Sequence, residues 1–463
     1  MKRAMASAKP NLLFLIADDH AGYVLGCAGN KLARTPNLDR LAGEGTRFAA
    51  HHCNSPVCTP SRQSLLTGLY PHAAGVTTLQ TPLDEKKTTI ADLLGASGYR
   101  TAVFGKMHFN APGKDGMHGF GTAMTEDRIN RGWQQAVGKP ARPWQPFRTP
   151  ADVWLNADKL AQPFAFDQMR STWATDQAKN WLSEHVKQAD QPFALWLSIQ
   201  EPHSPFWFPE EDRALFDPQR FSVPQVGPED AWQIPKIFAP LSPAQKQGII
   251  AAYYTSAFHL DKNLGRMLDH LRALDREKDT LVVYMADHGY SLGHHGRFEK
   301  HCMFTPALHV PLIMRFPGKL GKGKVQRKRT EHVDVAPTIL RLLGAERFPK
   351  THGRDLFEAP AREEIFSEYL ENEEAALIWE RWKLVYCTGK RHRQDGYETE
   401  NPTPGKTIRL FDQKSDAGEF RNMAAQYPAL VQTLTKKLEA KFQETHPEPG
   451  LNLDNYLRPR DVK

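Results

Sequence analysis

Short apolar runs of strand length alternate with segments of helical periodicity through the first three quarters of this sequence. Such alternation is typical of an α/β protein, in which helices cover both faces of a largely parallel sheet. The expected strands are Leu12–Ala17, Arg100–Phe104, Phe193–Ile199, Thr280–Ala286 and Pro311–Phe316. The expected helices between them are Pro36–Leu41, Ile90–Ser97 and Ala244–Leu274.

The pattern changes after residue 355, where short strands and a closing helix replace the alternation. The strands expected there are Glu364–Tyr369 and Leu377–Tyr386, and the helix is Pro428–Phe442. We therefore predict a large α/β domain over residues 1–357, with a central, mostly parallel mixed sheet flanked by helices. Residues 358–463 are predicted to form a small α+β domain with an antiparallel sheet.

Two stretches rich in proline and aromatic residues interrupt the large domain, Trp133–Trp154 and Pro202–Pro243. Loops of this length in a compact enzyme usually form lids or pocket walls. We expect them to border the functional site.

Composition excludes several classes of protein. The longest apolar run, Asn11–Ala17, is far shorter than the roughly 20 residues of a membrane helix, so no membrane partner is expected. The net charge of +7 on 463 residues is mild, and the basic tracts Lys319–Arg329 and Lys390–Arg393 carry no interleaved aromatics. Nucleic acid is therefore not an expected partner either, and a solvated surface explains both tracts. The oligomeric state is left open.

The five cysteines are odd in number and form no C-x-x-C pair, so a disulfide framework is not expected. No apolar segment of a secretory signal precedes the first strand, which favours a cytoplasmic location. A periplasmic or secreted location is the alternative, if a signal has been removed.

Acidic residues follow two of the expected strands. Asp18 and Asp19 come directly after the first strand, and Asp287 and His288 come directly after Thr280–Ala286. Ligands of open α/β sheets bind at the carboxyl ends of the strands, so these side chains are expected in one crevice. Carboxylates that repel each other there are usually offset by a divalent cation, and oxygen-rich ligation with one imidazole suits Ca²⁺ or Mg²⁺ and permits Mn²⁺. Taken alone, each pair could instead be a helix cap or a turn.

Cys58 lies just before Pro60, a residue that favours the start of a helix. A cysteine at a helix N-terminus sits where the dipole stabilises an anion, which suits a nucleophile. A buried cysteine that acts only as a small apolar residue is the alternative.

The segment Cys58-Thr-Pro-Ser-Arg62, followed by Leu66-Thr-Gly68, resembles the C-x-P-S-R signature of the type I sulfatases. This family belongs to the alkaline-phosphatase-like superfamily and depends on formylglycine. The resemblance implies that a formylglycine-generating or equivalent maturation enzyme oxidises Cys58, and that the aldehyde hydrate supplies the nucleophile. It also implies that Arg62 fixes this hydrate and that the large domain is the catalytic one.

The family's remaining site positions can be matched one at a time. Metal ligands fall on Asp18, Asp19, Asp287 and His288, with the modified Cys58 completing the set. Calcium is the implied ion, although many sulfatases have Asn where this chain has His288, which keeps Mn²⁺ and Mg²⁺ as alternatives. Sulfate-binding lysines fall on Lys106, in Gly105-Lys-Met-His108, and on Lys300. His108 matches the proton acceptor from the hydrate, and His203 matches the proton donor to the leaving oxygen.

These residues predict an enzyme that hydrolyses a small anionic sulfate ester to an alcohol and inorganic sulfate. The expected substrate is a carbohydrate sulfate, with choline sulfate or an aryl sulfate as alternatives. Phe109, Trp133, Trp144 and Trp207 could form an aromatic cage for choline or could stack on a sugar. Two other functions stay open: a phosphonate monoester or phosphodiester hydrolase of the same superfamily, and a polyanion-binding protein with an inactive site.

Overall fold

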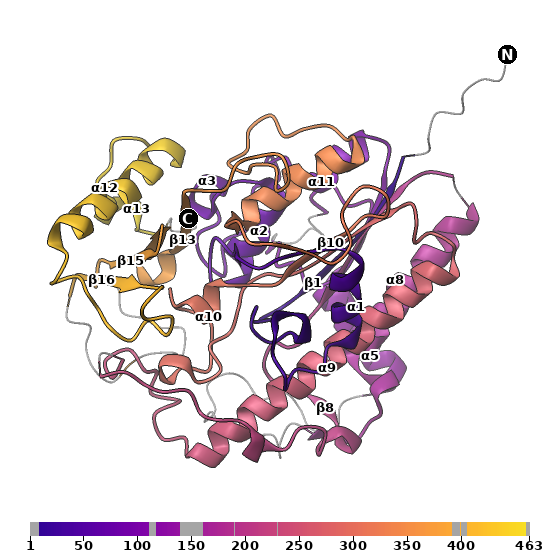
Figure 1. The fold of residues 1–463 in the computed structure, drawn as a ribbon. Coiled ribbons are helices and arrows are strands. Elements are labelled where there is room, and N and C mark those ends of the chain that lie inside the picture. The colour runs from indigo at the N-terminus through magenta and orange to yellow at the C-terminus, as the bar shows by residue number, and fades with distance from the viewer. Residues whose placement is uncertain are drawn as a thin grey trace.

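A mostly parallel sheet forms the centre of the molecule (Figure 1). The computed structural model describes residues 9–110, 117–138, 161–188, 190–228, 230–390, 399 and 405–459. Within these ranges the sheet has eight strands in the order β11-β2-β10-β9-β1-β7-β4-β5. In that order they are Lys324–Gln326, Thr46–Phe48, Leu312–Arg315, Thr280–Ala286, Asn11–Ala17, Phe193–Ile199, Arg100–Gly105 and Thr122–Met124. β10 runs antiparallel to both of its neighbours, and the other described pairings in this sheet are parallel.

The register of the central strands aligns their carboxyl ends. Ala17, the last residue of β1, lies opposite Ala286 at the end of β9 and opposite Ile199 at the end of β7. Gly105 ends β4 opposite Ser198 of β7. The segments that follow these four strands therefore emerge side by side at one edge of the sheet.

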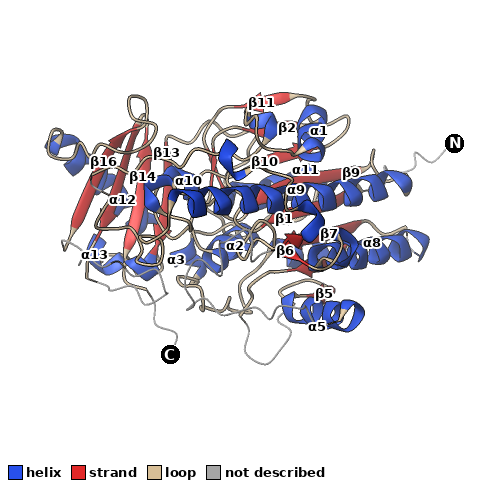
Figure 2. Cartoon of the chain, turned by 90° about the horizontal axis from the view of Figure 1, so that it is seen from below, coloured by secondary structure: helices blue, strands red, loops and turns tan. Residues whose placement is uncertain are grey.

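Helices cover both faces of this sheet (Figure 2). Alternate residues of β1 point to opposite sides, so Leu13 and Leu15 belong to one buried cluster and Leu12 and Phe14 to the other. The first cluster includes side chains of α1 (Pro36–Glu44), α8 (Arg170–Gln188) and α9 (Pro243–Ala273). The second includes side chains of α2 (Cys58–Thr67), α4 (Ile90–Ala96) and α11 (Val335–Leu343). Further helices are α3 (Pro71–Ala74), α5 (Glu126–Val137) and α10 (Thr305–Leu308).

The carboxyl-terminal part of the chain forms a second, antiparallel sheet in the order β13-β14-β15-β16. Its strands are Glu364–Tyr369, Glu374–Trp379, Trp382–Cys387 and Thr407–Asp412, and two helices follow, α12 (Pro428–Thr445) and α13 (Leu453–Tyr456). Leu434 and Leu438 of α12 pack against apolar side chains of this second sheet. Tyr369 and Phe411, from the same sheet, belong instead to the buried cluster of the large sheet. The predicted fold class is confirmed. The boundary between residues 357 and 358 stays a prediction.

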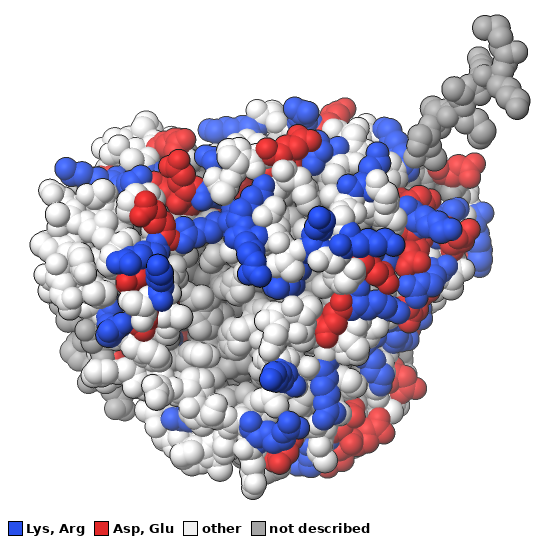
Figure 3. Space-filling model, viewed as in Figure 1, with Lys and Arg blue, Asp and Glu red and all other residues white. Residues whose placement is uncertain are grey.

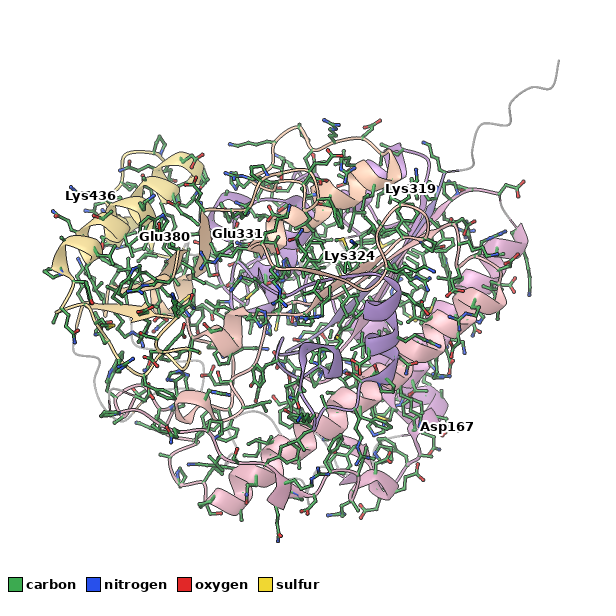
Figure 4. All side chains as sticks on the ribbon, in the orientation of Figure 1. Asp167, Lys319, Lys324, Glu331, Glu380 and Lys436 are labelled. Atoms are coloured by element: carbon green, nitrogen blue, oxygen red, sulfur yellow. The ribbon has the colours of Figure 1, made fainter. Side chains whose placement is uncertain are left out.

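Two sequence-based expectations are wrong in detail. The single strand expected over Leu377–Tyr386 is parts of two strands, because Trp379 pairs with Trp382 and the two residues between them form a tight turn. Glu380, labelled in Figure 4, takes the left-handed conformation that this turn needs, with φ of 49°. The loop expected from Trp133 begins later, because Trp133 lies in α5; most of that stretch, including Trp144, is outside the described residues.

The proline-rich segment 202–243 packs on α9 through its aromatic side chains. Phe206, Phe216 and Phe238 are buried there with Tyr253. The same segment lines a cavity of about 230 Å³ together with Lys246 of α9 and Gly296. Short strand pairs complete the fold: β12 (Thr330–Glu331) with β3 (His51–His52), and β6 (Ala161–Gln162) with β8 (Phe208–Pro209).

Charged side chains of both signs are spread over the visible face of the molecule (Figure 3). Lys319 and Lys324, from the basic tract noted in the sequence, are exposed to solvent (Figure 4). No helix in the described ranges has both the length and the apolar character needed to cross a membrane. The five cysteines all have free thiols.

Candidate active site

The two acidic pairs lie together, as the strand register requires. The backbone N–H of Asp19 donates to Asp287 Oδ1 across 3.2 Å, and the N–H of His288 donates to the same oxygen across 2.9 Å. Asp19 is held in the left-handed region with φ of 68°, which is uncommon for a residue other than glycine and often found at functional sites. Asp18, Asp19 and Asp287 are each almost fully buried.

Cys58 occupies the first position of α2 and faces this acidic cluster. The helix starts two residues earlier than Pro60 suggested, and the proline fits within the first turn because backbone N–H groups have no intrahelical partner there. Its sulfur lies 3.1 Å from His288 Nε2, 3.1 Å from Lys300 Nζ, 3.5 Å from Asp18 Oδ1 and 3.7 Å from Lys106 Nζ. One reactive position is thus surrounded by two ammonium groups, an imidazole and a carboxylate.

Lys106 and Lys300 come from distant parts of the chain and converge on the same position. Lys106 follows β4 and forms an ion pair with Asp18, and Lys300 Nζ lies 2.7 Å from Asp19 Oδ1. The approach of Lys106 depends on Gly105, whose φ is 112°, since a Cβ atom there would lie 1.8 Å from the carbonyl oxygen of Ser198. Only glycine fits this turn.

Arg62 ties the ends of several strands together from its place one turn into α2. Its Nε donates to Asp287 Oδ2 across 2.8 Å, and its Nη1 donates to the carbonyl of Lys106 across 2.5 Å and to Ser198 Oγ across 2.9 Å. The side chain is completely buried. These contacts join α2 to the segments after β9 and β4 and to β7, so Arg62 acts on the shape of the site through its neighbours. Ser198 carries no sequence signal, because it is one polar residue within a buried strand.

Three histidines surround the site in different ways. His288 is fully buried, with Nδ1 3.0 Å from Asp19 Oδ1. His203 Nε2 lies 3.9 Å from Asp19 Oδ2, and its other ring nitrogen contacts the carbonyl of Ser204. His108 has φ of 53°, and its Nδ1 is buried without a hydrogen bond. All three predicted histidines are therefore brought to the same edge of the sheet.

The electrostatics favour an anion at position 58. Burial alone would raise the pKa of the Cys58 thiol, but Lys106, Lys300 and His288 outweigh burial and hold this pKa well below its usual range. Burial raises the pKa of Asp287 to about 6, with Asp18 adding to the rise and Arg62 opposing it. Asp287, the Cys58 thiolate and Asp19 overcome the burial of His288 and raise its pKa to about 10.

The donor set fits a divalent cation. Ligand atoms of Asp18, Cys58, Asp287 and His288 all lie within 4.8 Å of one another. Asp19 Oδ2 is buried and accepts no hydrogen bond. Clustered carboxylate oxygens of this kind, with one imidazole, are the donors that Ca²⁺, Mg²⁺ and Mn²⁺ prefer.

The aromatic residues considered for a cage are mostly engaged elsewhere. Phe109 is 7 % exposed and packs against His118, with ring centroids 4.7 Å apart. Trp133 is 3 % exposed and donates through Nε1 to the carbonyl of Gln168 across 2.8 Å. Trp207 is half-buried. Phe109 and Trp133 thus belong to the core and present no open face to a ligand.

The fold and this cluster together define an α/β enzyme that binds an anion at the carboxyl edge of its sheet. The chain belongs to the sulfatase family: the sulfatase family model matches residues 10–345, and a second model, described as the C-terminal part of N-sulphoglucosamine sulphohydrolase, matches residues 293–446. The chain is therefore a sulfuric ester hydrolase, and the family is typically metal-dependent.

Individual relatives agree with this assignment. A protein described as a sulfatase from Formosa agariphila is 30 % identical over 455 residues, covering 90 % of this chain and 83 % of the relative. Arylsulfatase K of Bos taurus is 27 % identical, covering 98 % of this chain and 85 % of the relative.

Solved structures show the same fold. A phosphonate monoester hydrolase of Agrobacterium radiobacter matches with a TM-score of 0.78 at 23 % identity, covering 95 % of this chain and 96 % of that one. A protein solved in complex with its substrate D-glucosamine-2-N,6-O-disulfate matches with a TM-score of 0.74 at 21 % identity, covering 94 % and 98 %.

Proposed function

We propose that this sulfatase hydrolyses the sulfate monoester of a carbohydrate and that formylglycine made from Cys58 is its catalytic group. The observation that supports the proposal best is the position of the Cys58 sulfur, within 3.7 Å of Lys106, Lys300, His288 and Asp18. A sulfate group placed against position 58 would meet both ammonium groups.

The chain's own residues divide the reaction among them. Lys106 and Lys300 hold the sulfate oxygens, where negative charge grows in the transition state. His108 takes up a proton from the group at position 58, and His203 donates a proton to the bridging oxygen as the alcohol leaves. Arg62 keeps Asp287 and the segment after β4 in place. The aldehyde hydrate, when present, supplies the attacking oxygen, and the products are the alcohol and inorganic sulfate.

A cation held by Asp18, Asp19, Asp287, His288 and position 58 would supply positive charge beside the reacting group. Calcium is the proposed ion, because most of these donors are carboxylate oxygens. Magnesium and manganese are the alternatives that metal analysis of the purified enzyme would reveal.

Peptide mass spectrometry across Cys58, on protein made in a host with a maturation enzyme, tests the catalytic group. Conversion to formylglycine is the expected result. Cys58 is 2 % exposed, so the maturation enzyme is expected to act before the chain folds. A thiol that stays unmodified in such a host would refute the proposal and favour a polyanion-binding protein with an inactive site.

The likeness to a phosphonate monoester hydrolase makes that activity the second candidate. The pair Lys106 and His108 favours the sulfatase, since it resembles the G-K-x-H element of sulfatases. Comparison of kcat/KM for 4-nitrophenyl sulfate and 4-nitrophenyl phenylphosphonate separates the two. A larger value for the phosphonate would reverse the assignment.

A panel of sulfated monosaccharides and disaccharides, choline sulfate and aryl sulfates tests the substrate class. Turnover is expected to be fastest on a sulfated sugar. Phe109 and Trp133 are buried, so neither ring is open to a quaternary ammonium group or to a sugar, and turnover on the panel distinguishes the two substrates. Faster turnover of choline sulfate would contradict the expectation.

A further inference from the structure

A glutamate that the proposed reaction does not use lies beside His108. β5 runs parallel to β4, so it ends at the same edge of the sheet, and α5 begins directly afterwards with Glu126. Glu126 stands in the first turn of α5, where the helix dipole stabilises a carboxylate. The strand order thus places the carboxylate of Glu126 beside the segment that carries Lys106 and His108.

The contacts of Glu126 point to the outer nitrogen of His108. Glu126 Oε2 lies 3.9 Å from His108 Nε2, and Glu126 Oε1 lies 3.9 Å from Arg170 Nη1. Arg170 Nη1 also donates to Asn130 Oδ1 across 2.7 Å, which anchors that guanidinium to α5. The carboxylate is therefore held between a fixed arginine and the histidine.

The opposite nitrogen of His108 is the one available to the reaction. His108 Nδ1 is buried without a hydrogen bond, whereas about a quarter of the side chain, 24 %, is exposed. The ring meets negative charge on two sides, through a side-chain contact with Cys58 and through Glu126, which lies 3.9 Å from Nε2. A neutral imidazole has one N–H donor and one acceptor, and a carboxylate near Nε2 places the proton there.

We propose that Glu126 is a positioning residue for His108. It accepts a hydrogen bond from Nε2–H, directly after a small closure or through one water, and so leaves the Nδ1 lone pair facing position 58. When Nδ1 takes up a proton from the group at position 58, Nε2 keeps its own, and the Glu126 carboxylate offsets the charge of the imidazolium. The inference rests on the proposed function, because it requires His108 to be the proton acceptor.

Two other roles for Glu126 predict different measurements. A carboxylate that binds the substrate, for example through a sugar hydroxyl, would affect KM. A carboxylate that acts only through the field at Lys106 would affect turnover whether or not His108 is present. The side chain of Glu126 is 33 % exposed, so both roles are sterically open and need to be separated by experiment.

Steady-state kinetics of Glu126→Gln, His108→Ala and the double variant, on 4-nitrophenyl sulfate, carry out that separation. Glu126→Gln is expected to lower kcat about ten- to a hundredfold with little change in KM, as part of the roughly 10²–10⁴-fold that acid–base catalysis contributes. In the His108→Ala background the same substitution is expected to have no further effect, because residues that act as a unit are not additive. Asp127→Asn is the matched control, since Asp127 is an exposed carboxylate in the same turn of α5.

Crystal structures of Glu126→Ala and Asp127→Asn supply a readout that does not depend on turnover. The His108 ring is expected to lose its orientation in Glu126→Ala and to keep it in Asp127→Asn. The inference is overturned if the ring is unchanged in Glu126→Ala, if Glu126→Gln raises KM alone, or if it lowers kcat equally with and without His108. If His108→Ala leaves kcat unchanged, the proposed role of His108 fails instead, and the crystal structures still decide whether Glu126 orients the ring.

Discussion

Replacement of Arg62 by methionine should destabilise the protein more than any surface substitution of the same type. Methionine keeps most of the apolar stem but removes the group that binds Asp287, the carbonyl of Lys106 and Ser198. Arg62 and Asp287 are both fully buried, so the substitution removes the guanidinium from this carboxylate and leaves only His288 Nε2, 3.5 Å away, beside the same oxygen. Breaking a buried ion pair by removing one partner costs about 3–5 kcal/mol.

The corresponding change in melting temperature follows from the size of the chain. At about 2 cal/mol/K per residue, 463 residues have an unfolding entropy near 1 kcal/mol/K, so the loss corresponds to a decrease in Tm of about 3–5 °C. Differential scanning calorimetry at pH 7.5 with EDTA measures it without contributions from bound metal. Arg272→Met is the control: Arg272 is 44 % exposed and pairs with Glu277 on the surface, where such pairs contribute about 1 kcal/mol or less. A Tm of Arg62→Met within 1 °C of the Arg272→Met value would refute the reasoning.

Three further predictions follow from buried charges. Burial lowers the pKa of His20 from 6.5 to about 4, so between these pH values the unfolded chain binds a proton that the folded chain does not. The contribution of His20 to the free energy of unfolding is complete above pH 6.5 and falls by about 3 kcal/mol as the pH drops to 4. The decrease in Tm over this pH range should therefore be smaller in His20→Gln than in the unsubstituted protein. Calcium at a hundredfold excess over Kd should stabilise the metal-free protein by about 2.7 kcal/mol in a thermal titration, and no shift with calcium, magnesium or manganese would contradict the metal site. Lys383 Nζ lies 2.9 Å from Glu419 Oε1, and both groups are buried. Lys383→Met should therefore lower the free energy of unfolding, measured with denaturant, by about 3–5 kcal/mol. The double variant Lys383→Met, Glu419→Gln should regain much of this stability, because it leaves no buried unpaired charge. Equal stability of the single and double variants would show that the pair is not coupled.

The central strands were predictable because parallel strands are buried on both faces. β7 and β9 consist almost entirely of apolar residues, and both coincide with their predicted bounds. The hairpin of β14 and β15 was not separated in the sequence, because its turn consists of Glu380 and Arg381 and carries neither glycine nor proline. A turn made by such residues leaves no compositional break between two strands.

Much of the site was predictable for the same topological reason. Residues that follow parallel strands meet at one edge, so the sequence alone predicts that Asp18 and Asp287 lie together. The contacts that support them are not predictable in this way. Ser198 contacts Arg62, which is 136 residues away in sequence and lies on α2, and Glu126 lies beside His108, which is 18 residues away and follows the neighbouring strand β4.

The three cations of the site are not interchangeable, and the reason lies in how each is held. Arg62 donates from Nε and Nη1 to protein acceptors, which suits the planar guanidinium fork, and its Nη2 lies 3.7 Å from Asp18 Oδ2. Lys106 and Lys300 instead direct compact ammonium groups at position 58, at 3.7 and 3.1 Å from the sulfur. An arginine can therefore fix the framework of the site while two lysines meet the anion. Lysine at position 62 would keep the charge and lose the bridging contacts, so Arg62→Lys should lower both Tm and kcat, whereas a site that needed only positive charge at position 62 would keep both.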